Sequence, residues 1–190
     1  NRFFAVGLGA ILTVILQSSS ATTVILVSFA EAQLMNLTQA FGVILGAGIG
    51  TTLVVVLLSF QKITHYALLL VAIGIAVEKI SKVPRIKYVG SIMLGFGMIF
   101  FGMNLMSSAA IPLRESSAAI SVFQFLADNP FLNLLFATIF TGIIQASAAT
   151  IGLAIVLSYS GVLPFEACIP IVLGANIGTC ITAGLSCFGI

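Results

Sequence analysis

Five stretches of the sequence contain no charged residue, and each is long enough to cross a lipid bilayer as a helix. A spanning helix needs roughly 20 consecutive apolar residues. Charged residues make up only 6% of the chain, which is too little to cover the surface of a water-soluble domain. The sequence therefore predicts an all-α, multi-pass integral membrane protein in contact with the lipid bilayer, and we expect the cell (inner) membrane as its location. The uncharged stretches are residues 3–30, 32–61, 88–113, 129–165 and 167–190.

Two short motifs occur twice at one constant spacing. Residues 15–22 (ILQSSSAT) resemble residues 143–150 (IIQASAAT), and residues 45–51 (LGAGIGT) resemble residues 173–179 (LGANIGT). The offset is 128 residues in both cases (143 − 15 and 173 − 45). Compositional bias could align Leu with Ile, but it would not align Gln, Gly and Thr together without a gap. The paired motifs therefore predict a duplicated structure.

The first motif of each copy is a polar tip between two apolar arms. In the first copy, residues 3–16 and 21–33 flank Gln17–Ser20. Neither arm reaches full spanning length, yet together they exceed one crossing. This pattern predicts a re-entrant helical hairpin whose serine tip lies near the middle of the membrane. A single long helix, with its serines bonded back to its own carbonyl groups, is the alternative.

The second motif of each copy is rich in glycine. Three of the five residues from Gly46 to Gly50 are glycine, and each weakens a helix by about 1 kcal/mol relative to alanine. The pattern predicts a transmembrane helix that is broken there, and likewise at Gly174–Thr179, with irregular backbone lining a cavity. The alternative is close packing on a neighbouring helix through small residues, because Gly46 and Gly50 have GxxxG spacing.

The chain between the two copies adds further crossings. Residues 61–113 are predicted to form two plain transmembrane helices, and residues 114–128 an amphipathic helix at the interface. Together with the broken helix of the first copy (residues 1–60), this places three crossings between the two hairpins. The second copy (residues 129–190) should therefore enter from the opposite side, which predicts inverted-topology repeats. The basic residues between 79 and 87 predict that their loop is cytoplasmic.

Inverted repeats with interrupted helices are a common plan of secondary transporters, whose binding sites lie where the interruptions meet. Helix N-termini offer unpaired N–H groups to an anion, and hydroxyl and amide oxygens suit a hard cation such as Na⁺. No Lys or Arg lies within the motifs, so co-bound sodium would have to neutralise an anion. We expect the substrate to contact Gln17, Ser18, Ser19, Ser20, Gln145, Ser147 and Thr150. We expect sodium ligands among Gln17, Ser19, Thr22, Thr51, Gln145, Ser147, Asn176 and Thr179.

The doubled pattern of a Gln-Ser-Ser-Ser-type motif followed by a Gly-Ala-Asn-Ile-Gly-Thr-type motif resembles the type II sodium–phosphate cotransporter family. The resemblance covers residues 3–188 and implies sodium-coupled symport of inorganic phosphate by alternating access. It places the phosphate and sodium sites at Gln17–Ser20 and Gln145–Ala148. The sequence departs from the family pattern in two places. Ala146 and Ala148 remove two hydroxyls from the second copy, and Gly48 stands where the second copy has Asn.

Other functions on the same fold are a passive anion channel and a sodium-coupled transporter of another small oxyanion. An intramembrane serine hydrolase would need a base beside its nucleophile, and neither polar tip has one nearby in the sequence, so we expect no enzyme. No basic run is long enough to predict a nucleic-acid partner. A homodimer is left open.

Overall fold

Helices account for nearly all of residues 2–188, the part of the chain that the computed structural model describes, and no strand occurs in that part. The elements are α1 (Arg2–Leu16), α2 (Ser19–Glu31), α3 (Leu37–Leu58), η1 (Gln61–Tyr66), α4 (Ala67–Ile80), α5 (Pro84–Glu115), α6 (Ser117–Asp128), α7 (Pro130–Ile144), α8 (Ser147–Tyr159) and α9 (Phe165–Phe188).

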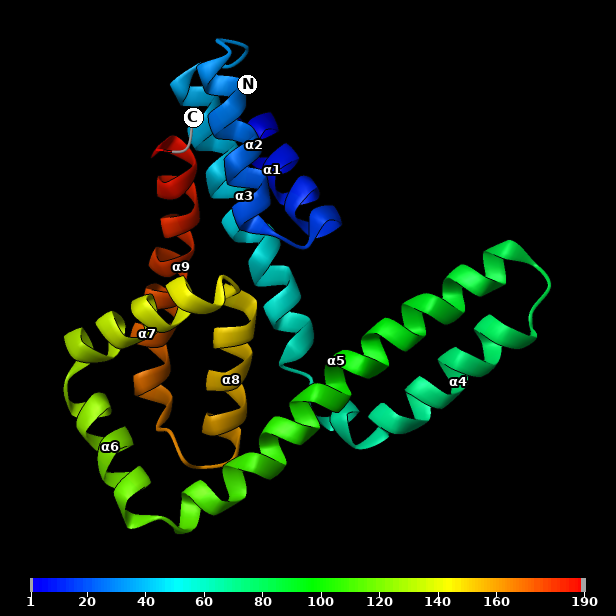
Figure 1. Cartoon of the computed structure of the whole chain (residues 1–190), viewed down its shortest axis with the longest axis vertical. Coiled ribbons are helices and arrows are strands. Elements are labelled where there is room, and N and C mark those ends of the chain that lie inside the picture. Colours follow the sequence, from blue (N-terminus) through cyan, green and yellow to red (C-terminus); the bar gives the residue numbers. More distant parts are fainter. Residues whose placement is uncertain (1, 189–190) are drawn as a thin grey trace.

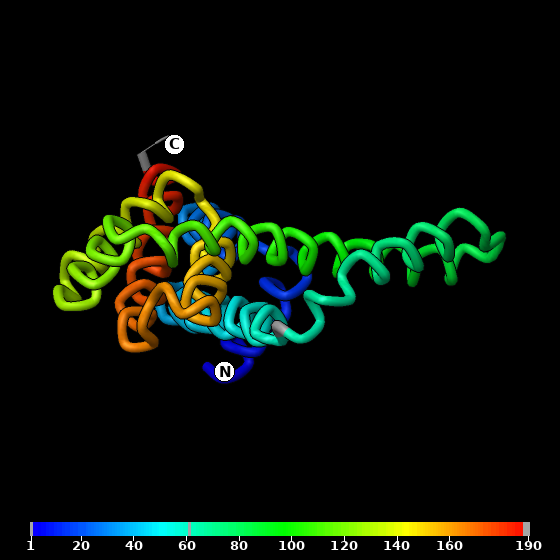
Figure 2. The backbone as a smooth tube through the Cα atoms, turned by 90° about the horizontal axis from the view of Figure 1, so that it is seen from below, coloured from blue at the N-terminus to red at the C-terminus, as the bar shows by residue number. Residues whose placement is uncertain are grey.

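The helices form three groups (Figure 1). α1, α2 and α3 form one bundle, α6 to α9 form a second, and α4 and α5 form a long hairpin that extends away from both (Figure 2). α5 runs back along this hairpin and continues past α8. The two bundles meet where α2 packs against α9 and α8 packs against α3.

The first arm and the second arm of each copy are separate helices, so the alternative of one long helix through the serines is wrong. α1 ends at Leu16 and α2 begins at Ser19. At 1.5 Å per residue, the 15 residues of α1 reach about 22 Å, which is short of the roughly 30 Å hydrocarbon core. Entry of this hairpin into the bilayer as a re-entrant element stays a prediction.

The predicted break at the glycine motifs is wrong in both copies, because α3 and α9 are continuous helices. The physical reason is close packing. A Cβ placed on Gly46 would lie 2.0 Å from the carbonyl oxygen of Val6, and one on Gly174 would lie 2.5 Å from the carbonyl oxygen of Leu134. These glycines therefore let α1 pack directly on α3 and α7 on α9, which is the alternative that the GxxxG spacing offered.

The same contacts recur at the 128-residue offset. Gly46 faces the backbone of Val6 and Ala10, and Gly174 faces the backbone of Leu134 and Thr138. This recurrence agrees with the predicted duplication. α3 runs down Figure 1 whereas α9 runs up it, so the two helices point in opposite directions. Inversion of the copies across a bilayer stays a prediction.

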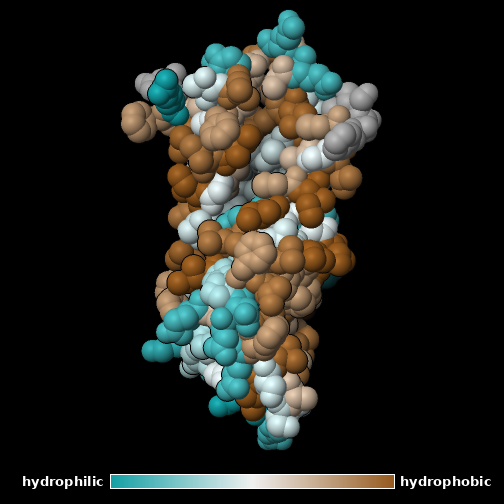
Figure 3. Space-filling model, turned by 90° about the vertical axis from the view of Figure 1, so that its left-hand side faces the viewer, coloured by the Kyte–Doolittle hydropathy of each residue, from teal (hydrophilic) through white to brown (hydrophobic). Residues whose placement is uncertain are grey.

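Four helices within residues 2–188 are long and apolar enough to cross a membrane. They cover Leu37–Leu58, Lys62–Ile80, Pro84–Glu115 and Phe165–Cys187. In Figure 3, apolar residues (brown) dominate the middle of the displayed face, and hydrophilic residues (teal) gather toward its two ends. This distribution suits a protein surrounded by lipid.

The boundaries around the predicted interfacial helix differ from expectation. Arg114 and Glu115 belong to α5, and α6 covers only Ser117–Asp128. α6 meets α7 at an angle of 109°. The location of α6 at a membrane interface stays a prediction.

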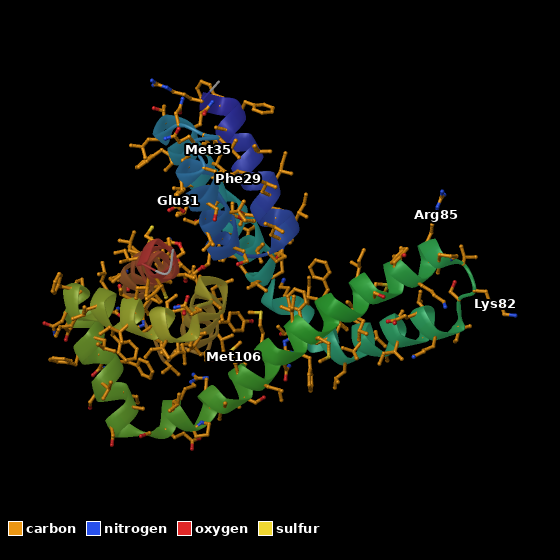
Figure 4. The ribbon with its side chains drawn as sticks, turned by 45° about the horizontal axis from the view of Figure 1, so that its top comes forward. Phe29, Glu31, Met35, Lys82, Arg85 and Met106 are labelled. Carbon is orange, nitrogen blue, oxygen red and sulfur yellow. The ribbon has the colours of Figure 1, made fainter. Side chains whose placement is uncertain are left out.

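No charged residue lines the central cavity between the two bundles. Lys82 and Arg85 lie at the far end of the α4–α5 hairpin, and Glu31 ends α2 (Figure 4). α8, by contrast, lies in the core, where Val156 is 1% exposed and packs with Phe100 of α5. The polar residues of the α8 tip are therefore held by an apolar frame.

The glycine packing makes a testable prediction with a control in the same helix. Gly46→Ala should lower the melting temperature, because the new methyl group collides with α1, and overpacking typically costs about 1–3 kcal/mol. Gly48→Ala should leave it unchanged or raise it, since a Cβ there meets nothing within 4 Å and alanine favours the helix. Thermal unfolding of the purified protein in detergent measures both. Equal shifts would contradict the packing role of Gly46.

Candidate functional site

The two predicted tips lie on one cavity of about 100 Å³ at the meeting point of the bundles. Ten of its lining residues form five pairs that are related by the 128-residue offset. The pairs are Gln17 and Gln145, Ser18 and Ala146, Ser19 and Ser147, Ser20 and Ala148, and Thr51 and Thr179. Thr13 and Val54 complete the lining. The structure thus brings together residues that lie more than one hundred positions apart in the sequence.

Each tip reverses the chain through a glutamine in the left-handed backbone conformation. Gln17 has φ 53° and Gln145 has φ 62°, a region that few residues other than glycine adopt. The backbone N–H of each donates to the carbonyl four residues earlier, at 2.8 Å for Thr13 and 2.7 Å for Thr141. This bond ends the first arm, and the left-handed residue turns the chain so that the next helix starts two residues later.

The second arms, α2 and α8, start at the cavity with their N-terminal ends. Ser18 caps α2, where its Oγ accepts a hydrogen bond of 3.1 Å from the N–H of Ala21. Ala146 holds the same position before α8 and provides no side-chain cap. The first N–H groups of a helix have no partner inside the helix. Both tips therefore present N–H groups and the positive end of a helix dipole to the cavity.

A threonine pair ties the two arms of each hairpin together behind the cavity. Thr141 donates to Thr150 at 2.8 Å, and Thr150 donates to the carbonyl of Ala146. In the first copy the Thr13 and Thr22 hydroxyls are 3.1 Å apart, and Thr22 donates to the carbonyl of Ser18. Thr22 and Thr150 were predicted to bind ligands, but they are buried and are not among the residues that line the cavity.

Thr51 and Thr179 face the cavity from α3 and α9. The Thr51 hydroxyl donates to the carbonyl of Ala47 at 3.1 Å, and the Thr179 hydroxyl donates to that of Asn176 at 2.8 Å, with the carbonyl of Ala175 at 3.1 Å. The hydrogen of each hydroxyl is thereby engaged, and the oxygen lone pairs stay available to a cation. The continuous helices thus still supply ligand oxygens, although they supply no broken ends.

Asn176 lies in a neighbouring cavity of about 370 Å³ instead of the central one. That cavity also contains Gly48, at the position equivalent to Asn176, and it shares Ser19, Ser20, Thr51 and Thr179 with the central cavity. The sequence reasoning missed Thr13 and Val54. Threonine recurs at positions 13 and 141, and this repeat at the same offset was a signal for Thr13; Val54 has no such signal.

Every residue that lines the central cavity is uncharged. Its electrostatic character therefore comes from helix ends, hydroxyl groups and amides. Such a site can bind ions of either sign, provided that the two charges are present together.

Comparison with known proteins decides the family. The family model described as Na+/Pi-cotransporter matches residues 1–108 and 115–190. The chain belongs to this family. No solved structure matches the chain.

Family relatives include bacterial and mammalian proteins. YjbB of Salmonella typhimurium, named as a candidate inorganic phosphate export protein, is 31% identical over 96% of this chain and 33% of its own length. YqeW of Bacillus subtilis is 32% identical over 91% of this chain and 56% of its own length. Sodium-dependent phosphate transport protein 2A of Rattus norvegicus is 30% identical over 55% of this chain and 16% of its own length. The chain thus spans about one third of YjbB.

The threonine pair behind the second tip gives a testable prediction about stability. Thr150→Val should lower the melting temperature by an amount equivalent to about 1–3 kcal/mol, because it leaves the fully buried hydroxyl of Thr141 without its acceptor. The double variant with Thr141→Val should lose less than the sum of the single variants, since both buried hydroxyls are then gone. Thermal unfolding of the four proteins measures this coupling. Additive losses would contradict it.

Proposed function

We propose that this chain forms the substrate-binding core of a sodium-coupled symporter of inorganic phosphate. The single observation that supports this most strongly is the convergence of Gln17–Ser20 and Gln145–Ala148 on one uncharged cavity. Two helix N-termini at one site favour an oxyanion. The surrounding hydroxyl and amide oxygens favour sodium.

The absence of charge in the lining explains why the two ions would move together. A phosphate ion that leaves water for a low-dielectric site loses several kcal/mol of solvation. No lysine or arginine lines the cavity to compensate for that loss. Sodium bound next to the phosphate supplies the missing charge, because the attraction between opposite charges grows as the dielectric constant falls. Coupling is then a requirement of binding.

The positions of the predicted residues refine their proposed roles. Thr51 and Thr179 are the best-placed sodium ligands on the long helices, since their hydrogens are engaged elsewhere. Thr22 and Thr150 position the tips instead of contacting ions. Asn176 would contribute from the adjoining cavity.

Alternating access would come from the two copies, with one hairpin opening to each side of the membrane. The opposite directions of α3 and α9 support this proposal. A symporter runs in whichever direction the combined gradients drive it. Relatives named for phosphate export and for sodium-dependent transport are therefore compatible with one mechanism.

Transport by the purified protein in lipid vesicles tests the proposal. Radiolabelled phosphate should accumulate above its external concentration under an inward sodium gradient, and should not accumulate under an equal potassium gradient. A sodium ionophore should abolish accumulation, because the driving force is the sodium gradient. Phosphate entry that equilibrates without accumulation, at a rate independent of sodium, would instead establish a passive anion channel. Accumulation of sulfate in preference to phosphate would establish another oxyanion as the substrate.

A further inference from the structure

The two tips of the central cavity have the same backbone but different chemistry. At three positions whose residue in the first copy lines the central cavity, the equivalent residue of the second copy differs in its hydrogen-bonding groups. The differences are Ser18 against Ala146, Ser20 against Ala148, and Val54 against Thr182. Each of them changes which atoms are free to bind an ion.

The first tip is rich in free oxygen atoms. Ser18, Ser19 and Ser20 place three hydroxyl groups along the cavity, of which that of Ser18 already accepts the N–H of Ala21. The amide nitrogen of Gln17 donates to the carbonyl of Val14 at 2.6 Å, and its Oε1 has no hydrogen bond to any part of residues 2–188. Val54, which lies at the position equivalent to Thr182, has no hydrogen to donate to that oxygen. The first tip therefore offers lone pairs, which a cation requires.

The second tip has few free oxygen atoms. The Oε1 of Gln145 accepts the hydroxyl hydrogen of Thr182, so one of its two lone pairs is already used. Ala146 and Ala148 replace two of the three serines and contribute only methyl groups. A cation at this tip would find one hydroxyl oxygen, that of Ser147.

The hydroxyl group of Ser147 is a hydrogen-bond donor without an acceptor in the described residues. It is 5% exposed, it lines the cavity, and its hydroxyl has no hydrogen bond within the described residues. Ser19, its equivalent at the first tip, is only partly buried. Within the described residues, Asn133 Oδ1 is the one fully buried side-chain oxygen or nitrogen without a partner, so the Ser147 oxygen is reached from the cavity that it lines. Together with the unpaired N–H groups at the start of α8, Ser147 forms a cluster of donors that matches an oxyanion.

We infer that the two tips divide the ions between them. The second tip binds the oxyanion through the Ser147 hydroxyl and the N–H groups of the first turn of α8. The first tip binds sodium through Gln17 Oε1 and the serine hydroxyls, whose lone pairs must outweigh the positive end of the α2 dipole at the same place. This division rests on the proposed function and adds to it the assignment of each ion to one copy of the duplicated hairpin.

A matched pair of substitutions tests the division, because Ser19 and Ser147 are the first residues of α2 and α8. In vesicles, Ser147→Ala should raise the phosphate concentration for half-maximal transport about tenfold or more at saturating sodium, since it removes a hydrogen bond to a charged group. The half-maximal sodium concentration at saturating phosphate should change by less than about twofold, because Ser147 does not contact sodium in this division. Ser19→Ala should raise the half-maximal sodium concentration about tenfold or more at saturating phosphate. It should change the half-maximal phosphate concentration at saturating sodium by less than about twofold.

A second variant tests the first tip without removing a serine. Val54→Thr introduces the hydroxyl that occupies the glutamine oxygen at the other tip. It should raise the half-maximal sodium concentration several-fold and leave that for phosphate unchanged. Ser28→Ala, an exposed position on α2 whose hydroxyl bonds to the carbonyl of Val24, should alter neither value.

The outcomes separate this inference from the proposed function. If Ser19→Ala and Ser147→Ala shift both ions equally, or if the assignments are exchanged, the division is wrong although sodium-coupled phosphate transport stands. If the unmodified protein shows no sodium-driven phosphate accumulation, the proposed function itself fails.

Discussion

Two helix ends within apolar sequence impose the central constraint on this structure. α2 and α8 begin with N–H groups that no carbonyl of the same helix can accept. In a bilayer, water does not reach such groups freely, and each unpaired group costs free energy. Bringing both ends to one polar cavity gathers their unpaired N–H groups in one place, where the proposed ligands would satisfy them. The glycine contacts of Gly46 and Gly174, the threonine pairs and the left-handed glutamines all serve to hold those ends in place.

The local features of the site could be predicted from the sequence. The reversal at Gln17–Ser18 follows from polar residues that interrupt two short apolar arms, and its recurrence at Gln145–Ala146 follows from the 128-residue offset. Thr51 and Thr179 are also related by this offset, and both residues line the cavity. Periodicity and repetition can be read from the sequence alone, so these features could be predicted without knowing which helices pack together.

The prediction that the structure contradicts, and the ligand assignments that it leaves untested, concern residues whose role depends on what lies opposite them. Helix propensity alone makes the glycines from Gly46 to Gly50 a weak point, but the proximity of the α1 backbone turns them into a packing surface. Thr22 looks like a ligand because it follows the serines, yet Thr13 lies within hydrogen-bond distance and engages it. Asn176 lines a neighbouring cavity, which its sequence position does not reveal, and its role as a sodium ligand stays a prediction.

The difference between positions that pack against a neighbouring helix and positions that line the cavity also explains which residues differ between the two copies. At Gly46 and Gly174 any side chain would collide with backbone, so packing holds these positions to glycine. Ser20 and Ala148, by contrast, line open volume, and a change there alters the chemistry of the cavity lining without removing a helix cap. A symmetric frame with an unsymmetric lining suits a carrier of two unlike ions, because one geometry can be used twice while one copy loses hydroxyls and the other keeps them. Close packing therefore preserves the symmetry of the duplicated fold, and the empty volume between the tips is where that symmetry can be broken.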